Sequence, residues 1–277
     1  MQKMTTFAFL RNLRKAYLMA EHNKLPLILV MNDDGVDASG IKVLASIAAH
    51  FGKVVMVAPA RSQSGKSHAI TFSNPLRYRQ LKKSAEMDIY KVYGTPVDAF
   101  KIADCEILKN RKPDLLLSGI NHGSNHSSSL IYSGTMAPVI EGCINGIPSI
   151  GFSLTDNGLE PDFEAARMYV YAIIYEAFRQ RMPSDVCLNV NIPAVSKEEI
   201  KGVKITRQGM NRWHEKLIRQ TDPFGKDYYW LSGALGKEDR RKDTDSWALK
   251  NNYISVQPVQ VDMTAYHYMD ELKNWKF

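Results

Sequence analysis

Three absences narrow the classes to which this 277-residue chain can belong. No stretch approaches the roughly 20 consecutive apolar residues that a membrane-spanning helix needs, so we expect no membrane partner. Only three cysteines are present, widely spaced and without a CxxC pair: Cys105, Cys143 and Cys187. This pattern provides no disulfide framework or zinc site and is typical of a reduced, cytoplasmic protein.

The common glycine-rich nucleotide fingerprints are also missing. The apolar run Leu27–Met31 is followed by Asn-Asp-Asp-Gly-Val-Asp instead of G-x-G-x-x-G, which disfavours a nucleotide-dependent transferase with a dinucleotide fingerprint. Residues Gly65-Lys66-Ser67 imitate the end of a P-loop, but the first glycine of that motif would fall at Ala60. A P-loop nucleoside triphosphatase is therefore disfavoured as well.

Positive charge is not concentrated in a way that indicates nucleic acid. The net charge is +7, but residues 1–20 hold four basic side chains and no acidic one, so the remaining residues carry +3. Later basic residues alternate with acids, as in residues 237–243, which is typical of a solvated surface. We expect no stable nucleic-acid partner, and we interpret residues 1–24 as a poorly ordered N-terminal extension.

From residue 25 to about 200, apolar strands alternate with helical segments. Strands that lack polar alternation are buried on both faces, and helices between them indicate a parallel sheet. The pattern predicts an α/β protein with a doubly wound, mainly parallel sheet, in a single domain over residues 25–277. The expected strands are 27–31, 54–58, 90–93, 114–118, 148–154 and 186–192, and the expected helices are 39–49, 96–108, 136–145 and 162–179.

The composition changes near Lys201. Two polar-aromatic stretches flank Asp222-Pro223-Phe224-Gly225, which has good turn composition, and together they predict a protruding β-hairpin arm within about residues 201–245. A helix near 245–250, a strand near 253–257 and a final helix from about Thr264 complete the expected elements. The many aromatic side chains of the arm fit oligomerisation better than exposure to water.

Three polar loops follow expected strands, at residues 32–35, 59–68 and 118–135. In a parallel sheet these loops meet at the carboxyl edge, where ligands bind. Their carboxylates, hydroxyls and amides are hard oxygen donors that suit Mg²⁺ or Mn²⁺. Their glycine- and serine-rich turns lead into helices and offer backbone N–H groups to a phosphate. The sequence therefore predicts a metal and phosphate site at this edge.

The adjacent acids Asp33 and Asp34 are the most informative part of these loops. Neighbouring carboxylates at the end of a buried strand repel each other, and a divalent cation turns that repulsion into shared attraction. By itself, Asp-Asp-Gly is also compatible with a tight turn or a helix cap. The loop histidines His68, His122 and His126 are compatible with ligands, proton shuttles or surface positions. The coincidence of all three loops at strand ends favours the metal site.

A longer series of motifs resembles the SurE family (survival protein E), over roughly Leu27 to Leu272. The motifs occur in the family's order: Asn32-Asp33-Asp34-Gly35, Gly40-Ile41, Ala58-Pro59, Ser64-Gly65-x-Ser67, Gly94-Thr95-Pro96-x-Asp98, Ser118-Gly119-Ile120-Asn121-x-Gly123-x-Asn125, Tyr132-Ser133-Gly134-Thr135, Glu141-Gly142 and Val256-x-Pro258-x-x-Val261-Asp262-x-Thr264-Ala265. The resemblance implies a Rossmann-like core with a C-terminal arm used in dimer or tetramer assembly.

The resemblance also implies an activity and a set of site residues. It implies a 5′-nucleotidase, a metal-dependent phosphatase of nucleoside monophosphates, with 3′-nucleotidase and exopolyphosphatase activity as further options. One Mg²⁺ or Mn²⁺ per subunit is expected on Asp33, Asp34, Ser64 and Asn121. Asp33 or Asp34 is expected to orient the attacking water as the catalytic group. The phosphoryl group is expected to contact six further residues: Gly65, Ser67, Asn125, Ser133, Gly134 and Thr135.

Two features leave room for other interpretations. Family members often carry Asn or Ser where this chain has His68, and Ala where it has His122, although neither position is an expected ligand. The main alternative function is a non-catalytic nucleotide- or RNA-binding module. The basic and aromatic stretch from Arg207 to Trp230, which includes Arg212, is its only candidate surface.

Overall fold

The computed structural model of the chain describes residues 25–109, 111–155, 158, 162–211, 213–236 and 239–276. The predicted extension at residues 1–24 and Arg212 of the proposed RNA-binding stretch lie outside these ranges.

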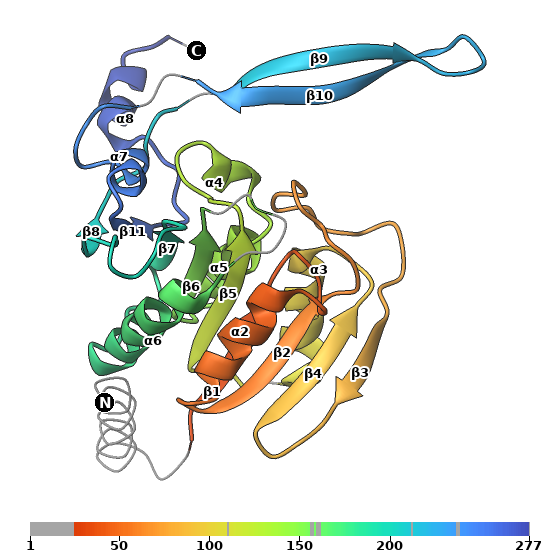
Figure 1. Cartoon of the computed structure of the whole chain (residues 1–277), viewed down its shortest axis with the longest axis vertical. Helices are drawn as coiled ribbons and strands as arrows, with labels where there is room; N and C mark the ends of the chain where they lie inside the picture. The colour runs from red at the N-terminus through yellow and green to blue at the C-terminus, as the bar shows by residue number, and fades with distance from the viewer. Residues whose placement is uncertain are drawn as a thin grey trace.

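A nine-stranded sheet forms the centre of the described molecule (Figure 1). The strand order is β3-β4-β2-β1-β5-β6-β7-β11-β8. The chain builds outward from β1 in one direction through β2 and β4, and in the other through β5, β6 and β7, so the order reverses between β1 and β5. The strands are β1 (Leu27–Met31), β2 (Lys53–Pro59), β3 (Tyr78–Lys82), β4 (Met87–Val92), β5 (Leu115–His122), β6 (Ser149–Leu154), β7 (Cys187–Ile192), β8 (Val203–Ile205) and β11 (Ile254–Val259).

The predicted α/β class and mainly parallel sheet are confirmed. The six central strands β4-β2-β1-β5-β6-β7 run parallel to one another, with β1 paired to β2 on one side and to β5 on the other. The sheet is nevertheless mixed, because β3 runs antiparallel to β4 and β11 runs antiparallel to β7. Both exceptions lie toward the edges, where a strand can pair on one side without a helical crossover.

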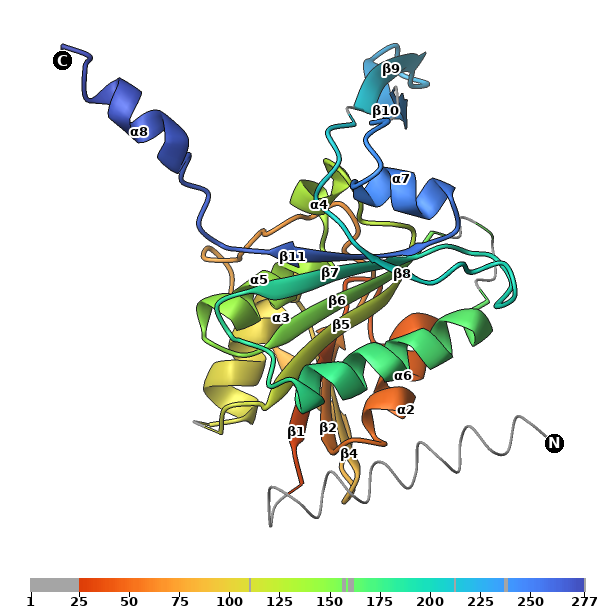
Figure 2. The same ribbon diagram turned by 90° about the vertical axis from the view of Figure 1, so that its left-hand side faces the viewer.

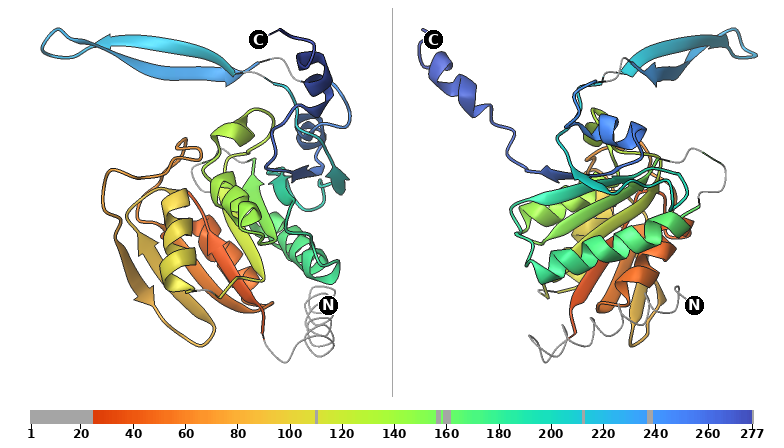
Figure 3. Two further views of the ribbon diagram at one scale, coloured as in Figure 1. Left: turned by 180° about the vertical axis from the view of Figure 1, so that it is seen from behind. Right: turned by 60° about the vertical axis from the view of Figure 1, so that its left-hand side comes forward.

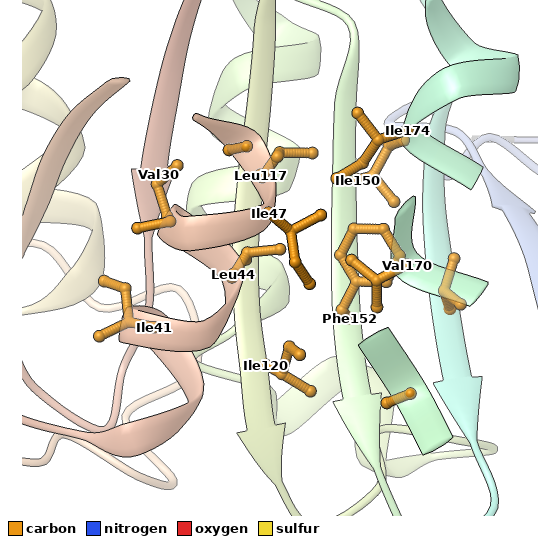
Figure 4. Close-up of a cluster of buried hydrophobic side chains, with 14 of the residues drawn as sticks. Val30, Ile41, Leu44, Ile47, Leu117, Ile120, Ile150, Phe152, Val170 and Ile174 are labelled. Carbon is orange, nitrogen blue, oxygen red and sulfur yellow. The ribbon is translucent and has the colours of Figure 1, made fainter. Parts of the chain in front are cut away.

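Helices cover both faces of the sheet (Figure 2). Helices α2 (Ser39–Ala48) and α6 (Glu164–Arg179) pack on one face, and α3 (Pro96–Ile102) and α5 (Met136–Ile144) pack on the other. Figure 4 shows Ile47 of α2 and Val170 of α6 beside the strand residues Leu117 and Phe152. Within the described ranges, no helix combines the length and hydrophobicity that crossing a bilayer requires.

Local sequence explains where several elements begin and why they are buried. Every residue of β1 is buried, as expected for a parallel strand covered on both faces. Helix α3 begins with a capping box, in which the Thr95 side chain accepts from the Asp98 backbone and Asp98 accepts from the Thr95 backbone, and Pro96 occupies its first turn. Thr244 caps α7 (Asp245–Lys250) in the same way by accepting from Trp247 N.

Three elements were not predicted. They are β3, the short helix α4 (Ser129–Tyr132) and β8. All five residues of β3 are exposed, so the strand lacks the hydrophobic alternation by which strands are recognised. Helix α4 is a single turn, and β8 has only three residues. Such elements are stabilised by pairing or packing with distant segments, which a local pattern does not contain.

The predicted hairpin projects from the body of the molecule (Figures 1 and 3). It consists of β9 (Trp213–Thr221) and β10 (Asp227–Leu235), which pair antiparallel with each other and with no strand of the main sheet among the described residues. The hairpin occupies the middle of the arm expected at residues 201–245. The last described element, α8 (Tyr266–Leu272), also extends away from the sheet (Figure 2).

Candidate active site

The residues of the predicted site gather where the strand order reverses. Met31, the last residue of β1, lies opposite Ser118 of β5, so the Asp-Asp loop begins beside the last residues of β5. The strand runs to His122 and not to residue 118 as predicted, so Asn121 lies in the strand and not in the loop after it. Ligands of open α/β sheets bind outside the carboxyl ends of the strands at this reversal. The topology therefore places Asp33, Asp34 and Asn121 at the favoured position.

Asp33 is a buried carboxylate with a hydroxyl partner. Its side chain is only 4% exposed, and its Oδ1 accepts a hydrogen bond from Thr135 Oγ1 at 2.7 Å. Burial raises the pKa of Asp33 to about 6, because removing the carboxylate from water disfavours its charged form. The Thr135 hydrogen bond opposes the rise, and repulsion from Asp34 adds to it. Burial thus disfavours the charged form of Asp33, and a cation beside it would stabilise that form.

Gly134 allows the loop before α5 to approach Asp33 closely. A Cβ atom built on Gly134 would lie 2.6 Å from Asp33 Oδ2 and 2.8 Å from Asp33 Cβ, so any side chain there would force Asp33 or the loop to move. Ser133 Oγ accepts from Met136 N at 3.0 Å and so stabilises the start of α5. The segment Ser133–Thr135 is thereby fixed against the first aspartate at the N-terminus of a helix, a position that attracts anions.

Asp34 is partly exposed and faces the end of β5. Burial raises the pKa of Asp34, while the backbone N–H and the nearby ring of His122 lower it. The Nε2 atom of His122 is buried without a hydrogen-bond partner in the described structure. Asn121 precedes His122 and donates from Nδ2 to Gly123 O at 2.6 Å, which leaves its Oδ1 to act as an acceptor or ligand.

The second loop reaches the aspartates through its backbone. Gln63 N donates to Asp33 O at 2.7 Å, so Ser64 directly follows a residue bound to the first loop. Ser64 Oγ lies 3.0 Å from Ser62 Oγ on the exposed side of the loop. Ser67 Oγ donates to Ile131 O at 2.6 Å and so joins the second loop to α4. All three predicted loops are therefore connected, while the hydroxyl of Ser67 is already occupied by a backbone carbonyl.

Asn125 has a different environment from the other expected phosphate contacts. Its Nδ2 donates to Ser153 Oγ at 2.8 Å and its backbone N donates to Asn191 Oδ1 at 2.7 Å, both buried. Asn189 Nδ2 completes this arrangement by donating to Asn125 O at 2.8 Å. A side-chain hydroxyl of β6 and two side-chain amides of β7 thus hold Asn125, and its own amide nitrogen is directed at the sheet.

The donor set fits a hard divalent cation. No group of three or more His, Cys, Asp or Glu side chains that would suit a metal occurs among the described residues, so a cation here must also use hydroxyl or amide oxygens. In the predicted ligand set, Ser64 and Asn121 would supply those oxygens, and Asp33 and Asp34 would supply the charge. Burial raises the pKa of both aspartates, and a divalent cation beside them would favour their charged forms.

A second buried acid near the site was missed in the sequence. Glu141 of α5 lies 2.8 Å from His68 Nε2 and accepts from Lys101 Nζ, so it links the second loop to α3 and α5. The hydrogen bonds from His68 and Lys101 lower the pKa of Glu141 despite its burial. Glu141 is the only charged residue within Met136–Ile144. A single acid in an apolar helix is a sequence signal for a buried, paired carboxylate.

Fold and candidate site together define an α/β protein with a cluster of carboxylate, hydroxyl and amide side chains at the carboxyl edge of its sheet. The family model described as Survival protein SurE matches residues 28–215, and the chain belongs to the SurE family. The resemblance drawn from the motifs is thereby confirmed.

Named relatives extend over nearly the whole chain. A protein of Flavobacterium johnsoniae named 5′-nucleotidase SurE is 51% identical over 252 residues, covering 91% of this chain and 97% of the relative. A Bacteroides fragilis protein of the same name is 46% identical over 255 residues, covering 92% and 99%. The crystal structure of the SurE protein from Aquifex aeolicus is similar with a TM-score of 0.77 and 40% identity, covering 90% of this chain and 98% of that one.

Proposed function

We propose that this protein is a 5′-nucleotidase that hydrolyses nucleoside monophosphates to nucleoside and inorganic phosphate. The observation that carries the proposal is the adjacent pair Asp33 and Asp34 at the point of strand reversal, buried and partly buried respectively. The names of relatives that are 46–51% identical over nearly their full length support the same activity.

The proposed cofactor is one Mg²⁺ or Mn²⁺ held by Asp33, Asp34, Ser64 and Asn121. When bound, such a cation neutralises phosphate charge and makes a water molecule more acidic. Asp33 contributes a fixed charge, since Thr135 holds one of its oxygens and Gly134 packs against the other. Asp34 is the more exposed carboxylate and is better placed to orient the attacking water.

The phosphoryl group is proposed to contact Gly65, Ser67 and the segment Ser133–Thr135. The start of α5 supplies the positive end of a helix dipole and backbone N–H groups to the charge that accumulates on phosphate oxygens. Asn125 remains an expected contact through the second N–H of its side-chain amide, because Ser153 Oγ engages only one of the two Nδ2 hydrogens. Hydrolysis then needs no covalent nucleophile from the chain, and the leaving nucleoside oxygen takes its proton from water.

A phosphate-release assay tests the proposal. Metal-stripped protein should release no phosphate from AMP or GMP, and activity should return with Mn²⁺ or Mg²⁺. Nucleoside 3′-monophosphates and short polyphosphate, assayed in parallel, define the substrate range. Full activity in excess EDTA would contradict the metal site, and nucleotide binding without hydrolysis would favour the non-catalytic alternative.

We further propose a single Rossmann-like domain that assembles as a dimer or tetramer through the arm. Large apolar side chains on the hairpin are 40–86% exposed, which is unfavourable in water unless a partner covers them. They include Trp213, Leu217, Ile218, Phe224, Tyr229, Trp230 and Leu231. A second copy of the chain is the partner that the resemblance implies, and it explains these side chains without a nucleic-acid ligand.

A further inference from the structure

A second buried aspartate lies far from the metal site in sequence and close to one of its loops. Asp245, at the start of α7, has no exposed surface. Its Oδ2 accepts a hydrogen bond from the backbone N–H of Ser127 at 2.7 Å. Ser127 lies 118 positions earlier in the chain, in the third site loop. Its Oδ1 accepts from Gly209 N at 2.9 Å, from Ser246 N at 2.6 Å and from Ser127 Oγ at 3.3 Å. Both carboxylate oxygens are therefore engaged.

Neighbouring residues at the base of the arm bind the same part of the loop. Gln208 Nε2 donates to Ser127 O at 2.9 Å, and Ser128 Oγ donates to Asn211 O at 2.7 Å. Asn211 is 1% exposed, and its Oδ1 accepts from Ser127 Oγ at 3.2 Å. The segment before β9 and the segment after β10 thus both contact Ser127, and we name Asp245, Gly209, Asn211 and Ser127 the Asp245 anchor.

The conformation of the loop depends on this anchor. Ser127 is fully buried and has a φ of 53°, in the left-handed region that residues other than glycine seldom adopt. Such a conformation persists when the surroundings compensate for it, here with hydrogen bonds to the N–H, the hydroxyl and the carbonyl of one residue. Gly209 is equally constrained, because a Cβ there would lie 2.6 Å from Ser127 Oγ and 2.9 Å from Asp245 Oδ1.

The anchor lies midway along the segment that carries the phosphate contacts. Upstream, Asn125 is bound to Ser153 and Asn191 of the sheet. Downstream, α4 leads into Ser133, Gly134 and Thr135, and Thr135 binds Asp33. Between these two attachments, Ser127 is held by residues at the base of the arm. A shift at Ser127 would therefore pass through one helical turn to the residues that face Asp33.

A role confined to capping α7 would not require this arrangement. Thr244 already caps that helix, and the Ser246 N–H alone would satisfy an aspartate in the first turn. We propose that Asp245 is a positioning residue for phosphate binding, which fixes the loop 123–135 through Ser127 and thereby holds Ser133–Thr135 against Asp33. This inference rests on the proposed function, since it concerns the same site.

The decisive variant is Asp245→Asn, with Asp243→Asn as a matched control. Asn keeps the size of the side chain but removes the charge and replaces one acceptor by a donor facing backbone N–H groups. Asp243 lies two residues away on the surface, where it pairs with Arg207. We expect Asp245→Asn to lower kcat/KM for AMP by about 10- to 100-fold at a temperature well below its Tm, as displacement of positioning groups does. The control should match wild type.

Two further readouts separate positioning from stability. In metal-free protein, Asp245→Asn should accelerate hydrogen exchange within residues 126–135 while exchange in β1 and β2 stays unchanged. The Mn²⁺ concentration for half-maximal activity should stay within about 2-fold of wild type, because Asp33, Asp34 and Ser64 lie outside the anchor. The variant should therefore bind metal normally and still hydrolyse AMP poorly.

Gly209→Ala provides an independent test that changes no charge. The added methyl group collides with Ser127 and should lower kcat/KM in the same direction, and it decides the matter if Asp245→Asn does not fold. Normal kcat/KM and normal loop exchange in the folded variants would overturn the inference, even if their Tm values fall. Absence of hydrolysis in wild type and in Asp243→Asn would instead contradict the proposed function itself.

Discussion

The carboxyl edge of the sheet and the β9–β10 hairpin each carry a feature that is unfavourable for folding. The edge buries a charged group, whereas the hairpin exposes apolar side chains. At the edge, Asp33 is 4% exposed and shares its loop with a second carboxylate. On the hairpin, Trp230 is 63% exposed and Leu231 is 72% exposed. Burying charge and exposing apolar surface both cost free energy in an isolated chain. These features are the ones that the two proposals address, a bound cation at the edge of the sheet and a protein partner on the hairpin.

The largest effect is expected from neutralising the aspartates. Asp33→Asn and Asp34→Asn keep side-chain shape and remove one charge each, so each should reduce AMP hydrolysis by at least about 100-fold, as loss of one preorganised electrostatic group does. Metal-free variants should unfold at the same temperature as wild type or higher, because the pair only repels without a cation. Early melting with normal turnover at low Mn²⁺ would make the pair a structural turn instead.

A smaller effect on activity is expected from Gly134→Ala. The new methyl group would meet Asp33 Oδ2 at 2.6 Å and must displace either the carboxylate or the start of α5. We expect a loss of about 10- to 100-fold in kcat/KM, because small displacements at a reaction centre are costly. Gly202→Ala is the control, since its surroundings are open and only its φ of 126° strains a side chain, whereas Gly134 has no positive φ and is constrained by its approach to Asp33. Equal activity in the two variants would show that Gly134 does not need to approach Asp33.

The stability of the metal-free protein should depend on pH through Asp33. The folded state raises the pKa of Asp33 from 3.8 to about 6, so it binds the proton more tightly than the unfolded chain does. The stabilisation is complete below the unfolded pKa and is lost as pH rises through the folded value. A shift of about two units corresponds to roughly 3 kcal/mol.

Urea unfolding in EDTA measures this contribution of Asp33 to the free energy of unfolding. The difference in unfolding free energy between wild type and Asp33→Asn should change between about pH 3 and 7, around the unfolded and folded pKa values of Asp33, with wild type relatively less stable at the higher pH. Comparing the two proteins cancels other titrating groups, such as Glu141, whose pKa is shifted downward. A difference that is independent of pH would mean that Asp33 is solvated in the folded protein.

The hairpin is expected to affect assembly more than folding. Strands β9 and β10 pair with each other and not with the main sheet in the described chain. Replacing residues 213–235 with a short flexible linker should convert an oligomer to a smaller species in light scattering while the Tm changes by only a few degrees. The paired substitution Ile218→Ser and Trp230→Ser, which lie opposite each other, should act in the same direction. A wild-type monomer at micromolar concentration would contradict the role of the arm.

Local sequence was a sufficient guide to much of the fold and to the position of the site. The buried strand Leu27–Met31, the helix over residues 39–48 and the hairpin turn at Asp222–Gly225 follow from hydrophobic periodicity and turn chemistry, which depend on neighbouring residues. The motif order was sufficient to indicate the family. Strands β3 and β8 were missed because pairing with distant strands, and not their own composition, makes them strands.

Only the tertiary structure decided how the loops support one another. The sequence by itself indicated that Asp33 and Asp34 follow one buried strand and that Asn121 lies near the end of another, because the point where an apolar run meets polar residues can be recognised from neighbouring residues alone. It contained no sign that Asn125 directs its amide at Ser153, that Glu141 joins His68 to Lys101, or that Asp245 holds Ser127. These contacts join residues 28 to 118 positions apart. Their partners meet only after the sheet has brought its crossovers together, so no periodic pattern along the chain records them.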